Sequence, residues 1–258
     1  LLGEIRMSIR TRVISIACGI LSLALLPSVT HASLIYFQEG FTDNLYSFDT
    51  VTGTDTFVGN MGPANDSMGL SFDLNGTLYG YNRSNSSLYT INTTTAATTL
   101  VGSSGISAES LSFDLNGNLF ISGGSNLYSL NTSNGAATLL GNIGVALDGL
   151  SVNPLTGVMY GIDSGSLYTV DINALTTSLL GSVSADETIA FAADGTLYGH
   201  SSSTFYSINL NTLTSTTIGT TTARFAFGSA IQLREANVPE PATLILFGLG
   251  LAGLAAAR

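Results

Sequence analysis

Three acidic residues occupy one repeated position in this sequence. Glu109, Asp148 and Glu187 each lie two residues ahead of a similar apolar segment. Asp66 lies near the corresponding place in an earlier copy, and Arg224 takes the adjacent place in a later one. Carboxylates that converge repel one another and favour a hard cation, which takes oxygen ligands. The pattern predicts a rim that binds a ligand or cation, with calcium the favoured ion, or else a solvated acidic rim.

The apolar segments belong to a repeat of about 40 residues. One element, LSFDLNG in its clearest form, begins at Leu70, Leu111, Leu150 and Ile189. A second element, typified by LYSFD, begins at Leu45, Leu88, Leu127, Leu167 and Phe205, with spacings of 43, 39, 40 and 38 residues. Short alternating strands with this period are typical of the four-stranded blades of a β-propeller.

Turn residues and the two ends of the repeat array predict how these strands connect. Asn75-Gly76 and Asn116-Gly117 separate alternating runs, which is the strongest local signal for a hairpin. The first copy begins at Leu34 without an innermost strand, and an extra strand at Phe225-Ala226-Phe227 follows the fifth copy. We therefore expect an all-β, five-bladed propeller over residues 33–235, closed by a C-terminal strand that removes the exposed edge.

In such a propeller the connections into the innermost strands line the mouth of the central channel. The acidic positions would then form one rim there. A secreted glycan-active hydrolase or lyase is the alternative function, because glycosidases use paired carboxylates. Catalytic carboxylates differ in environment, however, whereas these are interchangeable by repeat. His200, at the end of LYGH, is expected in a loop, and no nucleophile or metal-hydrolase motif occurs. We predict no catalytic residues and a non-enzymatic module.

The charge balance limits the partners of the chain. Residues 33–237 contain 15 acidic residues but only three arginines and no lysine, a net charge of −12. Nucleic acid and anionic lipid surfaces are poor partners, because few basic groups can replace phosphate counterions. Cations or neutral glycans fit better.

The N-terminal segment has the pattern of a secretory signal peptide. Arg10 and Arg12 precede an apolar run over residues 13–29, and small residues around Ala32 suit cleavage by signal peptidase. Translation is expected to start at Met7, with residues 1–32 removed. The only cysteine, Cys18, lies within this segment, so the mature chain folds without disulfides.

The C-terminal segment combines a stiff motif with an apolar run. Val238-Pro239-Glu240-Pro241 is held extended by its two prolines. Residues 242–257 carry no charge, and as a helix they would span ~24 Å, a marginal membrane anchor. Arg258 places the end of the chain in the cytoplasm.

Residues 236–258 resemble the PEP-CTERM sorting signal of exopolysaccharide-producing Gram-negative bacteria. The resemblance rests on the Val238–Pro241 motif, the Gly/Leu/Ala run and Arg258, although the family usually ends in a basic cluster. It implies export, a transient inner-membrane anchor through a short transmembrane helix, and removal of the tail by an exosortase. We expect a cell-surface or extracellular-matrix protein that acts as a structural or binding module with extracellular polysaccharide or biofilm.

Overall fold

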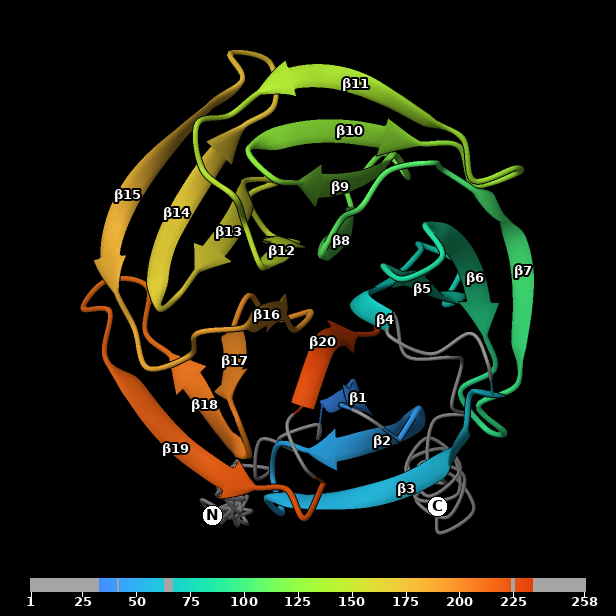
Figure 1. The fold of residues 1–258 in the computed structure, drawn as a ribbon. Helices are drawn as coiled ribbons and strands as arrows, with labels where there is room; N and C mark the ends of the chain where they lie inside the picture. Colours follow the sequence, from blue (N-terminus) through green and yellow to red (C-terminus); the bar gives the residue numbers. More distant parts are fainter. Residues whose placement is uncertain (1–32, 41, 63–66, 224–225, 234–258) are drawn as a thin grey trace, which may run out of the picture. The chain divides into compact units, whose positions relative to one another are not determined.

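The computed structural model describes residues 33–40, 42–62, 67–223 and 226–233, which form five four-stranded antiparallel sheets (Figure 1). Blade 1 consists, from the axis outward, of β20 (Ala226–Ile231), β1 (Leu34–Glu39), β2 (Asn44–Asp49) and β3 (Thr54–Asn60). Blade 2 consists of β4 (Ser67–Phe72), β5 (Leu78–Asn82), β6 (Ser87–Ile91) and β7 (Thr98–Ser103).

The remaining blades repeat this order. Blade 3 consists of β8 (Ser110–Phe113), β9 (Leu119–Gly123), β10 (Asn126–Leu130) and β11 (Ala137–Asn142). Blade 4 consists of β12 (Gly149–Val152), β13 (Met159–Asp163), β14 (Ser166–Asp171) and β15 (Thr176–Ser182). Blade 5 consists of β16 (Thr188–Phe191), β17 (Leu197–Ser201), β18 (Thr204–Ile208) and β19 (Ser215–Thr220). The predicted five-bladed propeller is confirmed.

The ring is closed by pairing between the two ends of the propeller. β20 pairs antiparallel with β1, with Ile231 opposite Ile35 and Ser229 opposite Phe37. A register shift follows at Gly228, whose φ of 53° suits glycine. In Figure 1 the red strand β20 lies against the blue strand β1 at the axis. The C-terminal strand therefore completes blade 1, as the sequence predicts.

Apolar side chains pack between neighbouring blades. At the closing seam, Phe205 of blade 5 stacks on Phe48 of blade 1 with ring centroids 4.2 Å apart, and it meets Phe37 edge-on at 5.1 Å. Outer strands also approach closely, since a Cβ atom at Gly102 would lie 1.9 Å from the carbonyl oxygen of Asn134 in the next blade. Only glycine fits at that contact, which explains a recurrent glycine of the repeat.

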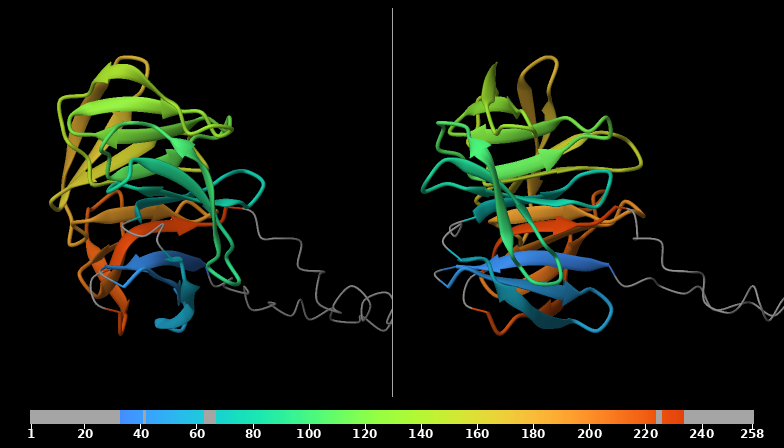
Figure 2. Two further views of the ribbon diagram at one scale, coloured as in Figure 1. Left: turned by 45° about the vertical axis from the view of Figure 1, so that its right-hand side comes forward. Right: turned by 90° about the vertical axis from the view of Figure 1, so that its right-hand side faces the viewer.

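The alternating strand directions sort the loops to the two ends of the channel (Figure 2). Turns between the innermost and second strands lie at one end, together with Ser33 before β1 and Leu233 after β20. We call this end the exit face. Connections into the innermost strands, with Glu109 and Asp148, lie at the opposite end, which we call the acidic mouth.

The predicted signal peptide and C-terminal helix lie outside the described residues. Among the residues that the structure describes, no helix is long and apolar enough to cross a membrane. The boundaries at residues 32 and 236 stay predictions.

Deleting residues 226–231 should open the ring. The deletion removes the β20–β1 ladder and leaves β1 as an unpaired edge strand beside the channel. We therefore expect aggregation or loss of cooperative unfolding. Thermal unfolding and size-exclusion chromatography measure this. Deleting residues 234–237 instead, which leaves β20 intact, is the control and should preserve the melting temperature. A monomeric 226–231 deletion with an unchanged melting curve would contradict closure by β20.

Candidate functional site

The central channel is too narrow to hold a ligand within its length. The cavity between the innermost strands has a volume of about 30 Å³, which is room for one or two water molecules. Serine hydroxyls close it further, because Ser71 Oγ accepts a hydrogen bond from the Phe113 amide at 3.1 Å and Ser151 Oγ accepts one from the Phe191 amide at 3.0 Å. A ligand larger than a few waters that uses the channel must therefore bind at one of its ends.

The acidic mouth brings charged side chains of consecutive blades together. Arg83, in the turn between β5 and β6, forms an ion pair with Glu109 of blade 3. Glu109 also lies close enough to Asp148 to raise its pKa, and Asp148 in turn raises the pKa of Glu187. Glu109, Asp148 and Glu187 thus lie near enough to influence one another, and their role as a ligand or cation rim stays a prediction. The other two predicted rim residues, Asp66 and Arg224, lie outside the described residues.

Two of these carboxyl groups have pKa values that are raised toward neutral pH. Burial raises the pKa of Asp148 to about 6; the Ser164 amide, which donates a hydrogen bond to Asp148 Oδ2 at 3.2 Å, opposes the shift, whereas Asp163 and Glu109 add to it. Burial, followed by repulsion from Asp186 and Asp148, raises the pKa of Glu187 to about 7. Both groups gain or lose protons near physiological pH, and such shifts are frequent at functional sites.

In the connection into blade 5, the backbone hydrogen bond to the second strand is shifted by one residue. The amides of Glu109 and Asp148 donate hydrogen bonds to the carbonyl oxygens of Ser122 and Ile162 on the second strands. In blade 5, Asp186 rather than Glu187 makes the equivalent bond, to His200 at 3.3 Å. Equal spacing in the sequence therefore hides a structural difference.

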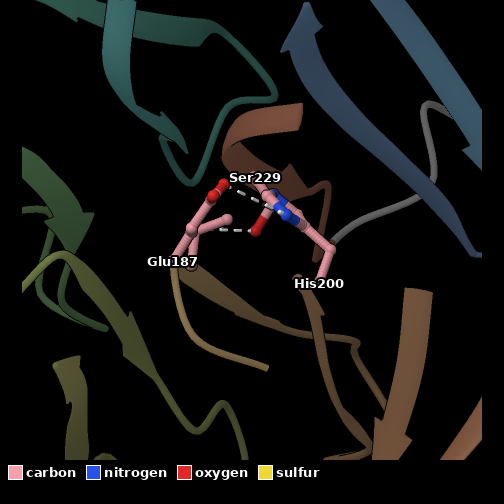
Figure 3. A network of polar contacts seen from close by, with 4 residues as sticks. Glu187, His200 and Ser229 are labelled. Atoms are coloured by element: carbon pink, nitrogen blue, oxygen red, sulfur yellow. Dashed lines mark hydrogen bonds and ion pairs between the residues drawn. The ribbon is translucent and has the colours of Figure 1, made fainter. Parts of the chain in front are cut away.

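His200 lies in a strand, not in the loop that the sequence led us to expect. It belongs to β17, and its side chain has no exposed surface. Its Nδ1 atom lies 3.8 Å from Glu187 Oε2, too far for a hydrogen bond, and the two side chains point toward each other (Figure 3). Burial lowers the pKa of His200 to about 3, so the imidazole is neutral.

The surroundings of His200 depart from the repeat. Equivalent second-strand positions in the other blades hold Gln38, Tyr81, Ser122 and Ile162. Ser229, across the closing seam, stands where the other innermost strands have Leu70, Leu111, Leu150 and Ile189. Its hydroxyl hydrogen-bonds to that of Thr188 at 3.1 Å. A leucine position that holds serine in one copy only was the sequence signal for this polar seam.

Several buried polar atoms of the seam have no hydrogen-bond partner within the described residues. They are both ring nitrogens of His200, Glu187 Oε2 and Asp186 Oδ1. An unsatisfied buried group costs about 1–3 kcal/mol, so water or a ligand group that bonds to these atoms is favoured. These atoms lie just beneath the acidic mouth. Glu187 connects the two, since its Oε2 atom is buried while its side chain as a whole is 30% exposed.

The geometry gives no support to the predicted calcium site. In the described part of the chain, no three His, Cys, Asp or Glu side chains are placed to hold a metal ion. Calcium binding therefore stays a prediction, to be tested with the other ligands.

Comparison with known families identifies the C-terminal segment. Residues 237–258 match the family model described as the PEP-CTERM protein-sorting motif. The chain carries a PEP-CTERM sorting signal. This signal marks an exported protein with a C-terminal membrane-anchor region, which an exosortase processes.

Solved structures share the fold of the propeller. A chain from the nidogen/laminin complex aligns with a TM-score of 0.55 at 13% identity, over 78% of this chain and 98% of that one. A structural genomics protein of unknown function from Bacteroides thetaiotaomicron aligns with a TM-score of 0.51 at 14% identity, over 72% of this chain and 58% of that one. No curated protein sequence matches this PEP-CTERM chain.

His200 should make the fold sensitive to acid. Its pKa of about 3 in the folded protein lies below the ordinary 6.5, so the unfolded chain takes up the extra proton and stability falls as pH drops below 6.5. Between pH 7 and pH 5 this group alone should cost roughly 2 kcal/mol. Chemical denaturation of a His200→Phe variant at both pH values should show a smaller loss than the wild type. Equal losses would contradict a buried neutral His200.

Glu187 should act in the opposite direction. Its pKa of about 7 in the folded protein exceeds the ordinary 4.5, so its stabilisation is complete below pH 4.5 and is lost as pH rises through 7. A Glu187→Gln variant cannot gain this proton and should lose more stability than the wild type between pH 7 and pH 5. Denaturation curves that shift equally with pH in both proteins would show that Glu187 titrates normally.

Proposed function

We propose that this protein is an exported, non-enzymatic binding module that holds extracellular polysaccharide at the acidic mouth of its propeller. The sorting signal directs it out of the cytoplasm and makes an exosortase its processing enzyme. The observation that carries the proposal is the convergence of Arg83, Glu109, Asp148 and Glu187 from successive blades at one end of a filled channel. Its final place is the cell surface or the extracellular matrix.

The chemistry of the acidic mouth fits a hydroxyl-rich ligand. Carboxyl groups whose pKa values lie near neutral pH are partly protonated. They can therefore both donate and accept hydrogen bonds, as sugar hydroxyls require. Arg83 supplies a permanent donor and is the only arginine among the described residues. A bound calcium ion is the other ligand to which clustered carboxylates are suited.

The shared fold also suits a binding role. The nidogen/laminin structure that resembles this propeller is a complex of two proteins. A propeller offers a broad end surface on a rigid ring, and its loops vary without disturbing the blades.

Titration of the processed protein with oligosaccharides and with calcium tests this proposal. Isothermal calorimetry of wild type, Asp148→Asn and Glu187→Gln should show about 10- to 100-fold weaker binding in the variants, the effect of losing a charged hydrogen bond. Asp194→Asn, a turn position on the exit face, is the matched control. Asparagine preserves that turn, because Asn75 and Asn116 stand at the same place, just before the turn glycine, in blades 2 and 3. Wild-type affinity in the mouth variants would contradict the proposal.

A glycan-active hydrolase or lyase is a second candidate, favoured by one observation. The three carboxyl groups, which are alike in sequence, have different environments in the structure. Glu109 pairs with Arg83, whereas Glu187 faces the neutral His200 and has a pKa of about 7. Two carboxyl groups in different environments, one beside an arginine and one with a raised pKa, are the arrangement of an acid–base pair.

Single substitutions separate the two candidates. In a hydrolase, Glu187→Gln should lower the rate of reducing-sugar release by about 100-fold or more, while oligosaccharide binding is retained. In a binding module no variant changes a rate, and affinity declines gradually over Glu109, Asp148 and Glu187. Absence of turnover by the wild type on the oligosaccharides that it binds would exclude the hydrolase.

A further inference from the structure

The exit face carries an apolar surface at the point where the chain leaves the propeller. Leu115, Leu155 and Val158 are 38%, 68% and 39% exposed and come from the turns after β8 and β12. Leu74 and Leu233 line the same end of the channel. We call Leu74, Leu115, Leu155, Val158 and Leu233 the leucine collar.

The members of the leucine collar lie around the axis in neighbouring turns. Leu115 reaches the turn of the next blade, where a Cβ atom at Gly157 would lie 3.7 Å from its Cδ1 atom. Leu155 reaches the following turn in the same way and packs against Gly195. The side chain of Gln232, next to Leu233, lies against the blade 2 turn at Gly76. The chain therefore leaves β20 within the collar and not at the outer rim.

The sorting motif begins a short distance beyond this point. Five residues, 234–238, separate Leu233 from Pro239. Even fully extended, this length of chain reaches at most about 22 Å. An enzyme of about 250 residues has a radius of gyration of about 18 Å, so one that holds the motif in its cleft must lie against the exit face.

We propose that the leucine collar is a docking surface for the exosortase during processing of the tail. The partner surface would be apolar beside its cleft and basic at its edge. The turn aspartates Asp73, Asp114 and Asp194 lie among the collar residues, and the described part of the exit face has no basic side chain. The same aspartates disfavour a bilayer of anionic lipid as the occupant. The proposal depends on the sorting signal and not on the ligand of the acidic mouth.

Site-specific photocrosslinking of the full chain in an exosortase-bearing host tests the contact directly. A photoreactive benzophenone amino acid at position 155 should crosslink to the exosortase, identified by mass spectrometry. The same residue at position 139, which is 58% exposed on β11, is the matched control and should not. Adducts at position 155 with lipid alone, or with a second copy of this chain alone, would assign the collar to that occupant and overturn the proposal.

The rate of processing supplies a second measurement. Leu115→Asp with Leu155→Asp should slow tail removal by at least about fivefold in a pulse-chase experiment, the effect of losing one modest interface contact. Phe57→Asp with Leu139→Asp, at outer-strand positions that are 55% and 58% exposed, should be processed at the wild-type rate. Wild-type processing of the collar variant would contradict docking.

A longer connection separates docking from folding and export. Inserting a 20-residue Gly/Ser segment between Glu235 and Ala236 adds a coil of about 25 Å on average, so the enzyme no longer needs to lie against the exit face. In this background the collar substitutions should no longer change the rate. If they slow processing equally with and without the insertion, the defect lies in folding or export, and the docking proposal fails.

Discussion

The pairing of β20 with β1 is the interaction on which the rest of the structure depends. Each blade buries its faces against two neighbours, and the interface between blades 5 and 1 exists only while the ring is complete. An open array would leave blades 1 and 5 with one bare face each and would lose the contact of Phe37 and Phe48 with Phe205. Residues 33–233 contain no cysteine that could form a disulfide across the seam, so the backbone ladder and these rings hold the ring closed.

The same seam is the place where the repeat is broken. A leucine that packs between blades elsewhere is replaced by Ser229, and opposite it stands the buried His200. Polar atoms without partners make this interface less stable than a fully apolar one, and a chain under selection for stability alone would keep leucine there. The substitution lies near Glu187, whose pKa is raised to about 7 by burial and by repulsion from Asp186 and Asp148. A local departure from consistency of this kind is typical of functional sites.

The fold could be predicted from the sequence because every blade repeats the same pattern of strands and turns. The 40-residue period, the Asn-Gly turns and the extra strand after the fifth copy specify strand number, order and closure. The acidic mouth was predictable for the same reason, since topology alone brings Glu109 and Asp148 together. Prediction from the pseudo-symmetry failed in blade 5, which differs from the other blades. The shifted backbone hydrogen bond of Asp186 and the burial of His200 depend on packing across the seam, where His200 and Ser229 are 29 positions apart in the sequence, and no spacing rule encodes that contact.

Closure by the C-terminal strand β20 also decides at which end of the propeller the chain enters and leaves. Because blade 1 takes one strand from the C-terminus and three from the N-terminus, β1 begins and β20 ends at the same end of the channel. The first and last described residues of the propeller, Ser33 and Leu233, therefore both lie at the exit face. A ring closed between two complete blades would instead have both of its ends at the acidic mouth, because each four-stranded blade begins and ends there. In this chain the sorting motif follows β20 within a few residues, so its connection to the propeller starts at the exit face and not at the acidic mouth, where we propose that the ligand binds.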